Sequence, residues 1–226
     1  MNFANLSPYK FEIFFFSQFL ILFGSVFISD FLFESYMLPV MLIINIFAGM
    51  ILMSRNKLKF TIFLFLLLLS GGLLVYKLLF TRLELEMTFF RLAINFIFYI
   101  FVTFEIIKQV WDSKKISSSI MFGLVSGYVS IGLIGYFVCT AIELATPGSF
   151  QHSLGETVMI ENMYDNFMYY SYITLLSIGY GDIIPVSVLA QKTSVLIGLF
   201  GQMYNVIITA IIVGKYLNQL NSSKSI

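Results

Sequence analysis

The sequence predicts an all-α membrane protein with six transmembrane helices, and with a short re-entrant helix and loop between the fifth and the sixth. Three observations support this fold class. The 226 residues are 59% hydrophobic and only 11% charged, whereas a soluble domain is about 25% charged. Six apolar runs approach the roughly 20 residues that a helix needs to cross a bilayer. A glycine-rich loop at 174–182 lies between the last two of these runs.

Composition excludes several classes of function. The net charge of +1 gives no basis for a nucleic-acid partner. The single cysteine, Cys139, excludes a disulfide framework and a cysteine metal cluster within one chain, and the single histidine, His152, argues against a histidine metal site or a Ser-His-Asp triad. We therefore expect neither enzyme activity nor a bound cofactor. The first apolar run has no A-x-A cleavage site after it and is interpreted as a retained span.

The six apolar runs follow one another with polar connections. They cover Glu12–Ser29, Tyr36–Met53, Leu58–Phe80, Phe89–Val110, Ser119–Leu144 and Val188–Gln219. The first begins just after Lys10. The third contains a Ser-Gly-Gly step at 70–72 that permits a kink or close packing. The sixth is long enough to extend past the bilayer. We expect each run to form one transmembrane helix.

Basic residues in the connections predict the orientation of the chain. Nine lie on one side, namely Lys10, Arg55, Lys57, Lys59, Lys108, Lys114, Lys115, Lys215 and Lys224. The other side has four, namely Lys77, Arg82, Arg91 and Lys192, together with most of the acidic residues. By the positive-inside rule, both termini of this multi-pass protein are expected in the cytoplasm, with the helices in the plasma membrane. An even number of spans agrees with this orientation.

A polar, basic and serine-rich segment at 111–119 separates the fourth run from the fifth. Residues 1–112 are therefore predicted to form a four-helix transmembrane unit. Residues 113–226 are predicted to form a second unit, which holds the last two spans with the short helix and loop between them. The turn-rich segment Ala145–Asn162 is predicted to be an extracellular loop that leads into this helix.

The residues Asn166–Ser177 are predicted to form the short helix. About 12 residues of helix extend roughly 18 Å, which is too short to cross the membrane, so the helix should enter and stop. Asp165 or Asn166 is the predicted N-cap at the outer surface. The C-terminal end of the helix then points into the protein, and its partial negative charge favours a cation.

The loop after this helix carries the sequence Ser-Ile-Gly-Tyr-Gly-Asp. Backbone at membrane depth is costly unless it is buried in protein or lines an aqueous path. Gly179 and Gly181 allow positive φ at little cost, so left- and right-handed conformations can alternate and direct successive carbonyls toward one axis. We expect the carbonyls of Ser177, Ile178, Gly179 and Tyr180 to stack as rings of cation ligands. The side chains of Ile178 and Tyr180 would then pack behind them.

These residues resemble the selectivity filter of the potassium channel superfamily. The family pattern is a pore helix with two adjacent aromatic residues and a serine, then T-x-x-T-x-G-Y-G-D and a nearby proline. The matching residues are Tyr169, Tyr170, Ser171, Thr174, Ser177, Gly179, Tyr180, Gly181, Asp182 and Pro185. The chain departs from the pattern at Ser177 and Leu176, where threonine is usual or frequent. It departs again at Ile173, where some relatives carry a glutamate that partners the aspartate.

The resemblance implies which residues form the filter and what assembles around it. The implied filter residues are Ser177, Ile178, Gly179, Tyr180 and Gly181, with K⁺ held through the first four. The implied supporting residues are Thr174, Tyr169, Tyr170 and Asp182. Because Ile173 carries no carboxylate, Asp182 is expected to rely on the hydroxyl of Tyr169 or Tyr170. One chain supplies one loop and a carbonyl ring needs four, so a homotetramer is implied.

The sixth run adds to this resemblance through the segment Gly198–Tyr204. Gly201 lies near the middle of the run, where related channels often have a gating-hinge glycine. Close helix packing is the alternative role for Gly201, since glycine is common in membrane helices. The Gly-Gln-x-Tyr sequence at 201–204 is also similar to a pattern in prokaryotic members. The chain thus resembles the prokaryotic six-transmembrane type with one pore loop.

The first four runs occupy the place of a voltage sensor, but the charges that such a sensor needs are absent. Arg91 is followed at every third position by uncharged residues, namely Ile94, Ile97, Ile100 and Thr103. Steep voltage gating is therefore not expected. Glu105 is expected either to pair with Lys108 at i+3 or to be solvated. Asn45 and Asn95 are candidate interhelical hydrogen-bond partners.

The sequence thus predicts a channel that conducts K⁺ passively, with K⁺ as permeant ion and no cofactor. From the short stretch after the sixth run we expect no attached ligand-binding domain. Either lipid, tension, pH or an unidentified regulatory partner is then expected to act on the gate, or the pore is open by default. Membrane lipid is an expected partner. The alternative left open is a sensory or transport membrane protein in which the first four helices carry the function.

Overall fold

The computed structural model describes residues 7–29, 32–54, 56–80, 85–113, 117–153 and 163–224. Within these ranges, six helical segments are long and apolar enough to cross a membrane. They run Ser7–Phe27, Phe33–Leu52, Lys57–Leu79, Leu85–Asp112, Ser118–Ala145 and Val188–Leu217. The predicted all-α membrane fold is confirmed. The predicted loop charges Arg55, Arg82, Lys114 and Lys115 lie outside the described residues.

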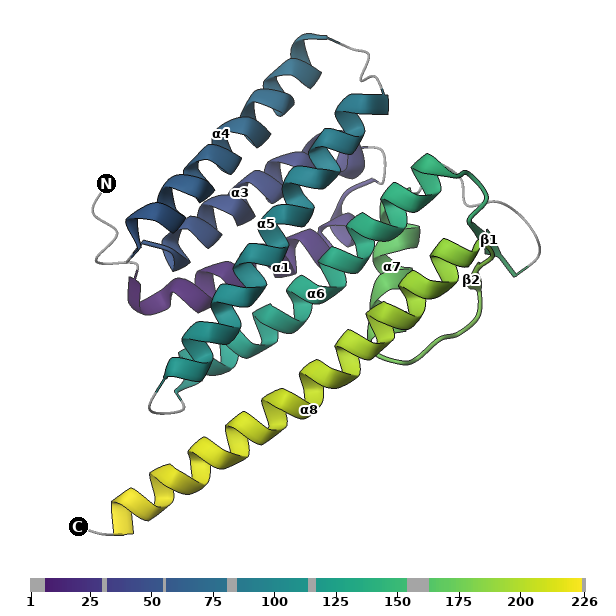
Figure 1. Ribbon diagram of the computed structural model, residues 1–226. Coiled ribbons are helices and arrows are strands. Elements are labelled where there is room, and N and C mark those ends of the chain that lie inside the picture. Colours follow the sequence, from purple (N-terminus) through teal and green to yellow (C-terminus); the bar gives the residue numbers. More distant parts are fainter. Residues whose placement is uncertain are drawn as a thin grey trace.

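The N-terminal half contains four of these spans (Figure 1). They are α1 (Lys10–Phe23) with a 3₁₀ turn after it, α3 (Leu38–Leu52) with a π turn before it, α4 (Lys57–Leu79) and α5 (Leu85–Asp112). Local sequence explains where these helices begin. The Asn56 side chain accepts a hydrogen bond from Lys59 N and caps α4. Pro39 lies in the first turn of α3, where its missing N–H costs nothing.

The C-terminal half contains α6 (Ser118–Ala145), β1 (Phe150–His152), α7 (Met163–Leu175), β2 (Ile183–Pro185) and α8 (Val188–Lys224). The strands β1 and β2 form an antiparallel pair in which Gln151 lies opposite Ile184. Figure 1 shows α8 as a long helix that continues past the level at which α6 begins. The helix α7 packs on both α6 and α8.

The two halves share an extensive interface. Both α1 and α5 pack directly on α6, and the α5–α6 pair is the most extensive helix contact in the described chain (Figure 1). The division into units at residues 112 and 113 stays a prediction. By contrast, the main helix contacts of α4 within the described residues are with α3 and α5, and most of its apolar surface is exposed.

A buried polar chain joins the helices near the centre of the N-terminal half. The Asn45 Nδ2 donates to Ser17 Oγ at 2.7 Å, and the Tyr99 hydroxyl donates to Asn45 Oδ1 at 2.7 Å. These bonds link α1, α3 and α5, so the predicted interhelical role of Asn45 is confirmed. The same prediction is wrong for Asn95, because its Nδ2 donates to Arg91 O within the same helix.

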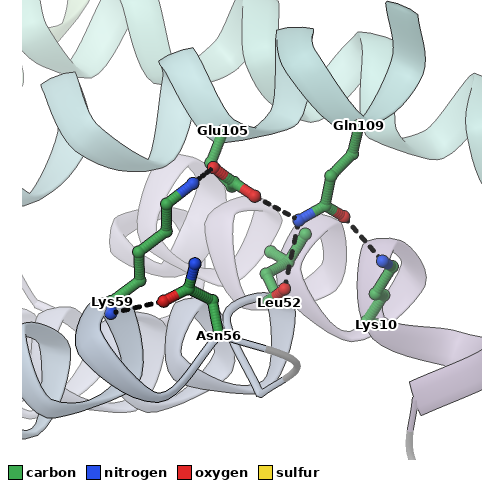
Figure 2. A network of polar contacts seen from close by, with 6 residues as sticks. All are labelled: Lys10, Leu52, Asn56, Lys59, Glu105 and Gln109. Atoms are coloured by element: carbon green, nitrogen blue, oxygen red, sulfur yellow. Dashed lines mark hydrogen bonds and ion pairs between the residues drawn. The ribbon is translucent and has the colours of Figure 1, made fainter. Parts of the chain in front are cut away.

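A second polar network ties four helices together where α1 and α4 begin and α3 and α5 end (Figure 2). Lys59 forms an ion pair with Glu105. Gln109 Nε2 donates to Glu105 Oε1 at 3.0 Å and to Leu52 O at 3.1 Å. Lys10 Nζ donates to Gln109 Oε1 at 2.6 Å. Neither alternative predicted for Glu105 holds, because its ion pair is with α4 and not within its own helix.

Lys215 attaches the far part of α8 to the end of α5. Lys215 Nζ donates to Val110 O at 2.7 Å, to Trp111 O at 2.8 Å and to Ser113 O at 2.5 Å. Its fourth contact is Ser113 Oγ, at 3.0 Å. A helix C-terminus exposes unpaired carbonyls and partial negative charge, so an ammonium group binds there favourably.

We expect Asn45→Ala to lower the stability of the folded protein by about 1–2 kcal/mol, because Tyr99 and Ser17 would each lose a buried partner. Thermal unfolding of the purified protein in detergent measures this loss. Ile44→Ala is the matched control, since Ile44 is 49% exposed on the same helix. Equal loss of stability in the two variants would contradict a structural role for the network.

Candidate functional site

The re-entrant helix α7 packs closely on α6 through small residues. Its 13 residues extend roughly 20 Å, too little to span a bilayer. The Ser171 hydroxyl donates to Gly132 O at 2.6 Å. The Tyr172 hydroxyl donates to Val129 O at 2.6 Å. A Cβ at Gly132 would lie 2.3 Å from the Tyr172 ring. Any larger residue at this position would displace α7, so the two helices fix each other's position.

The N-terminus of α7 is bound by a carboxylate from the other half of the chain. Glu34, in the turn before α3, accepts a hydrogen bond from Tyr164 N at 2.9 Å. The Tyr164 hydroxyl donates to Ile21 O, and its ring packs against Phe33. The predicted N-cap at Asp165 or Asn166 is wrong, since α7 already begins at Met163. Glu34 serves this helix end because its negative charge is favourable at the positive end of the dipole.

After α7 the backbone alternates in handedness. Positive φ occurs at Ser177 (58°), Gly179 (58°) and Gly181 (79°), and not at Ile178 or Tyr180. The alternation that the Gly-x-Gly spacing predicted is therefore confirmed. No atom lies within 4 Å of the position that a Cβ on either glycine would take, so conformation and not space requires glycine here.

In this loop, the backbone N–H groups of 177–179 are hydrogen-bonded to α7, whereas the carbonyl groups of 177–180 accept no hydrogen bond from the described residues. The N–H of Ser177 donates to Thr174 O at 3.0 Å, and the N–H of Ile178 donates to Ile173 O at 2.8 Å. Gly179 N also donates to Ile173 O, at 3.3 Å. Among the described residues, none donates a hydrogen bond to the carbonyl oxygens of 177–180. The loop thus directs its donors toward the end of α7 and leaves a row of carbonyls for other ligands.

The outer end of the loop is held by the two short strands. Ser153 N donates to Asp182 O at 2.9 Å, and Val186 N donates to Ser149 O at 2.8 Å. The buried carboxylate of Glu143 in turn accepts from Gly148 N at 2.6 Å and from Phe150 N at 3.0 Å. The sequence indicated only an extracellular loop here, and it gave no sign that Glu143 anchors the strand that pairs with β2 after the loop.

Of the two tyrosines expected to serve Asp182, the structure brings only Tyr169 to it. The Tyr169 phenol forms a hydrogen bond with the Asp182 carboxylate. The hydroxyl of Tyr170 instead lies 2.5 Å from Ser194 Oγ on α8. It also forms a hydrogen bond with Thr174. The two predicted supporting tyrosines therefore have different partners. Tyr169 contacts Asp182, whereas Tyr170 contacts Ser194 and Thr174.

At the inner end of the loop, α8 approaches the backbone of α7 directly. A Cβ at Gly201 would lie 2.3 Å from Leu175 O, so close packing explains this glycine. A hinge at Gly201 stays a prediction, and α8 is one continuous helix through this residue. The next residue, Gln202, donates from Nε2 to Ser177 Oγ at 2.7 Å. The sequence placed Gln202 beside Gly201 in the Gly-Gln-x-Tyr motif but did not indicate this contact.

We expect Gly201→Ala to destabilise the protein by about 1–3 kcal/mol, because the new methyl group meets backbone that cannot move aside. Gly214→Ala is the control on the same helix, where nothing lies within 4 Å of the added Cβ. Its expected effect is neutral or stabilising by up to about 1 kcal/mol, since alanine favours helix. Thermal unfolding measures both variants. An unchanged transition in Gly201→Ala would rule out the tight contact with Leu175.

Comparison with known proteins points to the same part of the chain. The family model described as ion channel matches residues 123–218, from the first turns of α6 through α7 and the loop to the far part of α8. No curated protein and no solved structure matches the chain. The family match covers the stretch that resembles the potassium channel superfamily and confirms that resemblance, while the six-transmembrane type stays a prediction. The chain is a multi-pass membrane protein, and its residues 123–218 match the ion-channel family.

Proposed function

We propose that this protein is a potassium-selective channel that conducts K⁺ passively as a homotetramer. The observation that carries the proposal is the loop at 177–181, where φ alternates in sign and the carbonyls of 177–180 have no donor among the described residues. Potassium binds neutral oxygen, and rings of backbone carbonyls replace its hydration shell in channels. The negative end of the α7 dipole faces the same region and favours a cation.

The apolar side chains that a single chain leaves exposed support a tetramer. Ile178 and Tyr180 next to the loop carbonyls are 48% and 72% exposed on one subunit. Much of the apolar surface of α8 is also uncovered, including Leu199 and Phe200. Four copies around one axis would close the carbonyls into rings and cover these side chains. In this arrangement the protein lies in the plasma membrane with both termini in the cytoplasm.

Arg91 gives no support for steep voltage gating. It lies in the first part of α5 and lines a small cavity with Lys77 of α4 and Asn95. Each elementary charge that crosses the membrane contributes about 2.3 kcal/mol per 100 mV, so steep gating needs several moving charges per subunit. The following third positions in α5 are uncharged. The channel is therefore proposed to open in response to a stimulus other than voltage.

Gly179→Ala is expected to abolish K⁺ conduction. An L-residue at a φ of 58° costs about 1–2 kcal/mol in each subunit, so the loop would leave the alternating conformation. Single-channel recording of the purified protein in bilayers, with K⁺ and Na⁺ on opposite sides, measures conduction and selectivity together. Gly72→Ala is the control, because its Cβ also meets nothing within 4 Å while its φ is ordinary.

Two results would contradict the proposal. Unchanged conduction by Gly179→Ala would remove the filter assignment, and similar permeation of Na⁺ and K⁺ through the unmodified protein would remove selectivity. A membrane protein whose first four helices carry the function would give no K⁺ current in either protein.

The voltage dependence is tested in the same recordings. Open probability is expected to change little across the physiological voltage range, and Arg91→Gln is expected to leave its steepness unaltered. A steep dependence that Arg91→Gln flattens would show that α5 senses voltage.

A further inference from the structure

The hydrogen bond between Gln202 and Ser177 joins α8 to the innermost residue of the loop. Its length is 2.7 Å from Nε2 to Oγ, and its two residues are 25 positions apart in the chain. We propose that Gln202 is a positioning residue that holds the Ser177 hydroxyl at the inner end of the filter and thereby contributes to the discrimination of K⁺ from Na⁺. This inference rests on the proposed function.

Ser177 needs an external partner if its hydroxyl is to stay in one place. A serine side chain has three staggered rotamers and lacks the second branch that restricts χ1 in threonine or valine. Ser177 is exposed on the subunit. Its backbone is fixed by the bond from its own N–H to Thr174 O. The bond from Gln202 selects one rotamer of the side chain.

The chemistry of the hydroxyl leaves a place for a cation. A serine oxygen has two lone pairs. When one of them accepts the amide proton of Gln202, the other is available to an ion at the inner end of the loop. Because an amide is neutral at all pH values, this positioning adds no charge to the ion path and does not depend on pH.

Gln202 is itself held by its neighbours on α8. Gly201 brings the helix backbone against Leu175 O, and the Tyr128 hydroxyl of α6 donates to the same carbonyl at 3.2 Å. Two residues further on, the Tyr204 hydroxyl donates to Leu124 O of α6 at 2.6 Å. The backbone on both sides of Gln202 is thus tied to α6 or α7, and its amide is presented to the loop from a fixed position.

A fixed oxygen favours the larger ion. Selectivity of carbonyl and hydroxyl sites depends on the position and number of the coordinating oxygens. A hydroxyl that can rotate freely can follow a smaller ion and coordinate Na⁺ almost as well. In the proposed tetramer four Gln202 amides would hold four hydroxyls around the axis, so loss of the bond would affect the whole innermost ring.

The test is a double-mutant cycle on the full chain, with the K⁺/Na⁺ permeability ratio obtained from reversal potentials in bilayers. Gln202→Leu keeps the side-chain size and removes the donor. It is expected to lower the ratio about tenfold, since the loss of one net hydrogen bond corresponds to about one power of ten. Ser177→Ala is expected to lower the ratio to a similar extent. The double variant is expected to show no further loss, because residues that act through one contact are not additive.

Two further variants make the cycle independent of folding defects. Gln202→Asn keeps the amide but shortens its reach, and we expect it to lower the ratio as Gln202→Leu does. Met203→Leu is the control on the same helix, since Met203 is 55% exposed and offers no donor to the loop, so it should keep the unmodified ratio. Each variant is recorded only after its oligomer mass and its unfolding temperature match those of the unmodified protein.

The outcomes separate this inference from the function on which it rests. Suppose that the unmodified protein selects K⁺ and that both Gln202 variants, to Leu and to Asn, have the same permeability ratio as the unmodified protein. The positioning role is then overturned, while the channel assignment stands. If the effects of Gln202→Leu and Ser177→Ala multiply in the double variant, Gln202 acts without Ser177 and the inference also fails. If the unmodified protein does not select K⁺, the proposed function itself falls.

Discussion

The structure depends on one constraint, which is that a loop of backbone among apolar helices must satisfy its N–H groups without using its carbonyls. The end of α7 meets this constraint. Its carbonyls at Ile173 and Thr174 accept the N–H groups of Ser177, Ile178 and Gly179. A helix always ends with unpaired carbonyls, so the short helix supplies acceptors at the point where the loop needs them. The loop carbonyls then remain for an ion.

The two ends of this segment are held by carboxylates that accept backbone N–H groups. Glu34 binds Tyr164 N where α7 begins, and Glu143 binds the N–H groups of Gly148 and Phe150 beside the outgoing strand. All three bonds have a carboxylate as acceptor, and hydrogen bonds to ionised groups are roughly twice as strong as neutral ones. Since Glu34 belongs to the N-terminal half, that half contributes directly to the position of α7.

The fold class, the six spans and the alternating backbone could be predicted because each follows from a pattern within a short stretch of chain. Apolar runs reveal helices, and Gly179 and Gly181 reveal where φ becomes positive. Contacts between distant stretches could not be predicted in the same way. Helical periodicity predicts contacts only within one helix. It therefore indicated Lys108 as the partner of Glu105, whereas the structure pairs Glu105 with Lys59 of another helix. Gln202 is another such case, because its partner lies in a loop 25 residues away.

Lys215 binds the end of α5 at a point on α8 that lies far from the contact at Gly201, so a small tilt of α8 there becomes a large displacement at Lys215. Gly201 and Lys215 are 14 residues apart on one helix, which corresponds to roughly 21 Å. A tilt of about 10° around the Gly201 contact would move Lys215 by roughly 3.5 Å, which exceeds the length of each of its hydrogen bonds. A rotation of this size would draw the Lys215 ammonium group away from oxygens that all lie at one helix end, so the four contacts would weaken together. The attachment of the far part of α8 to α5 therefore depends on the tilt of α8.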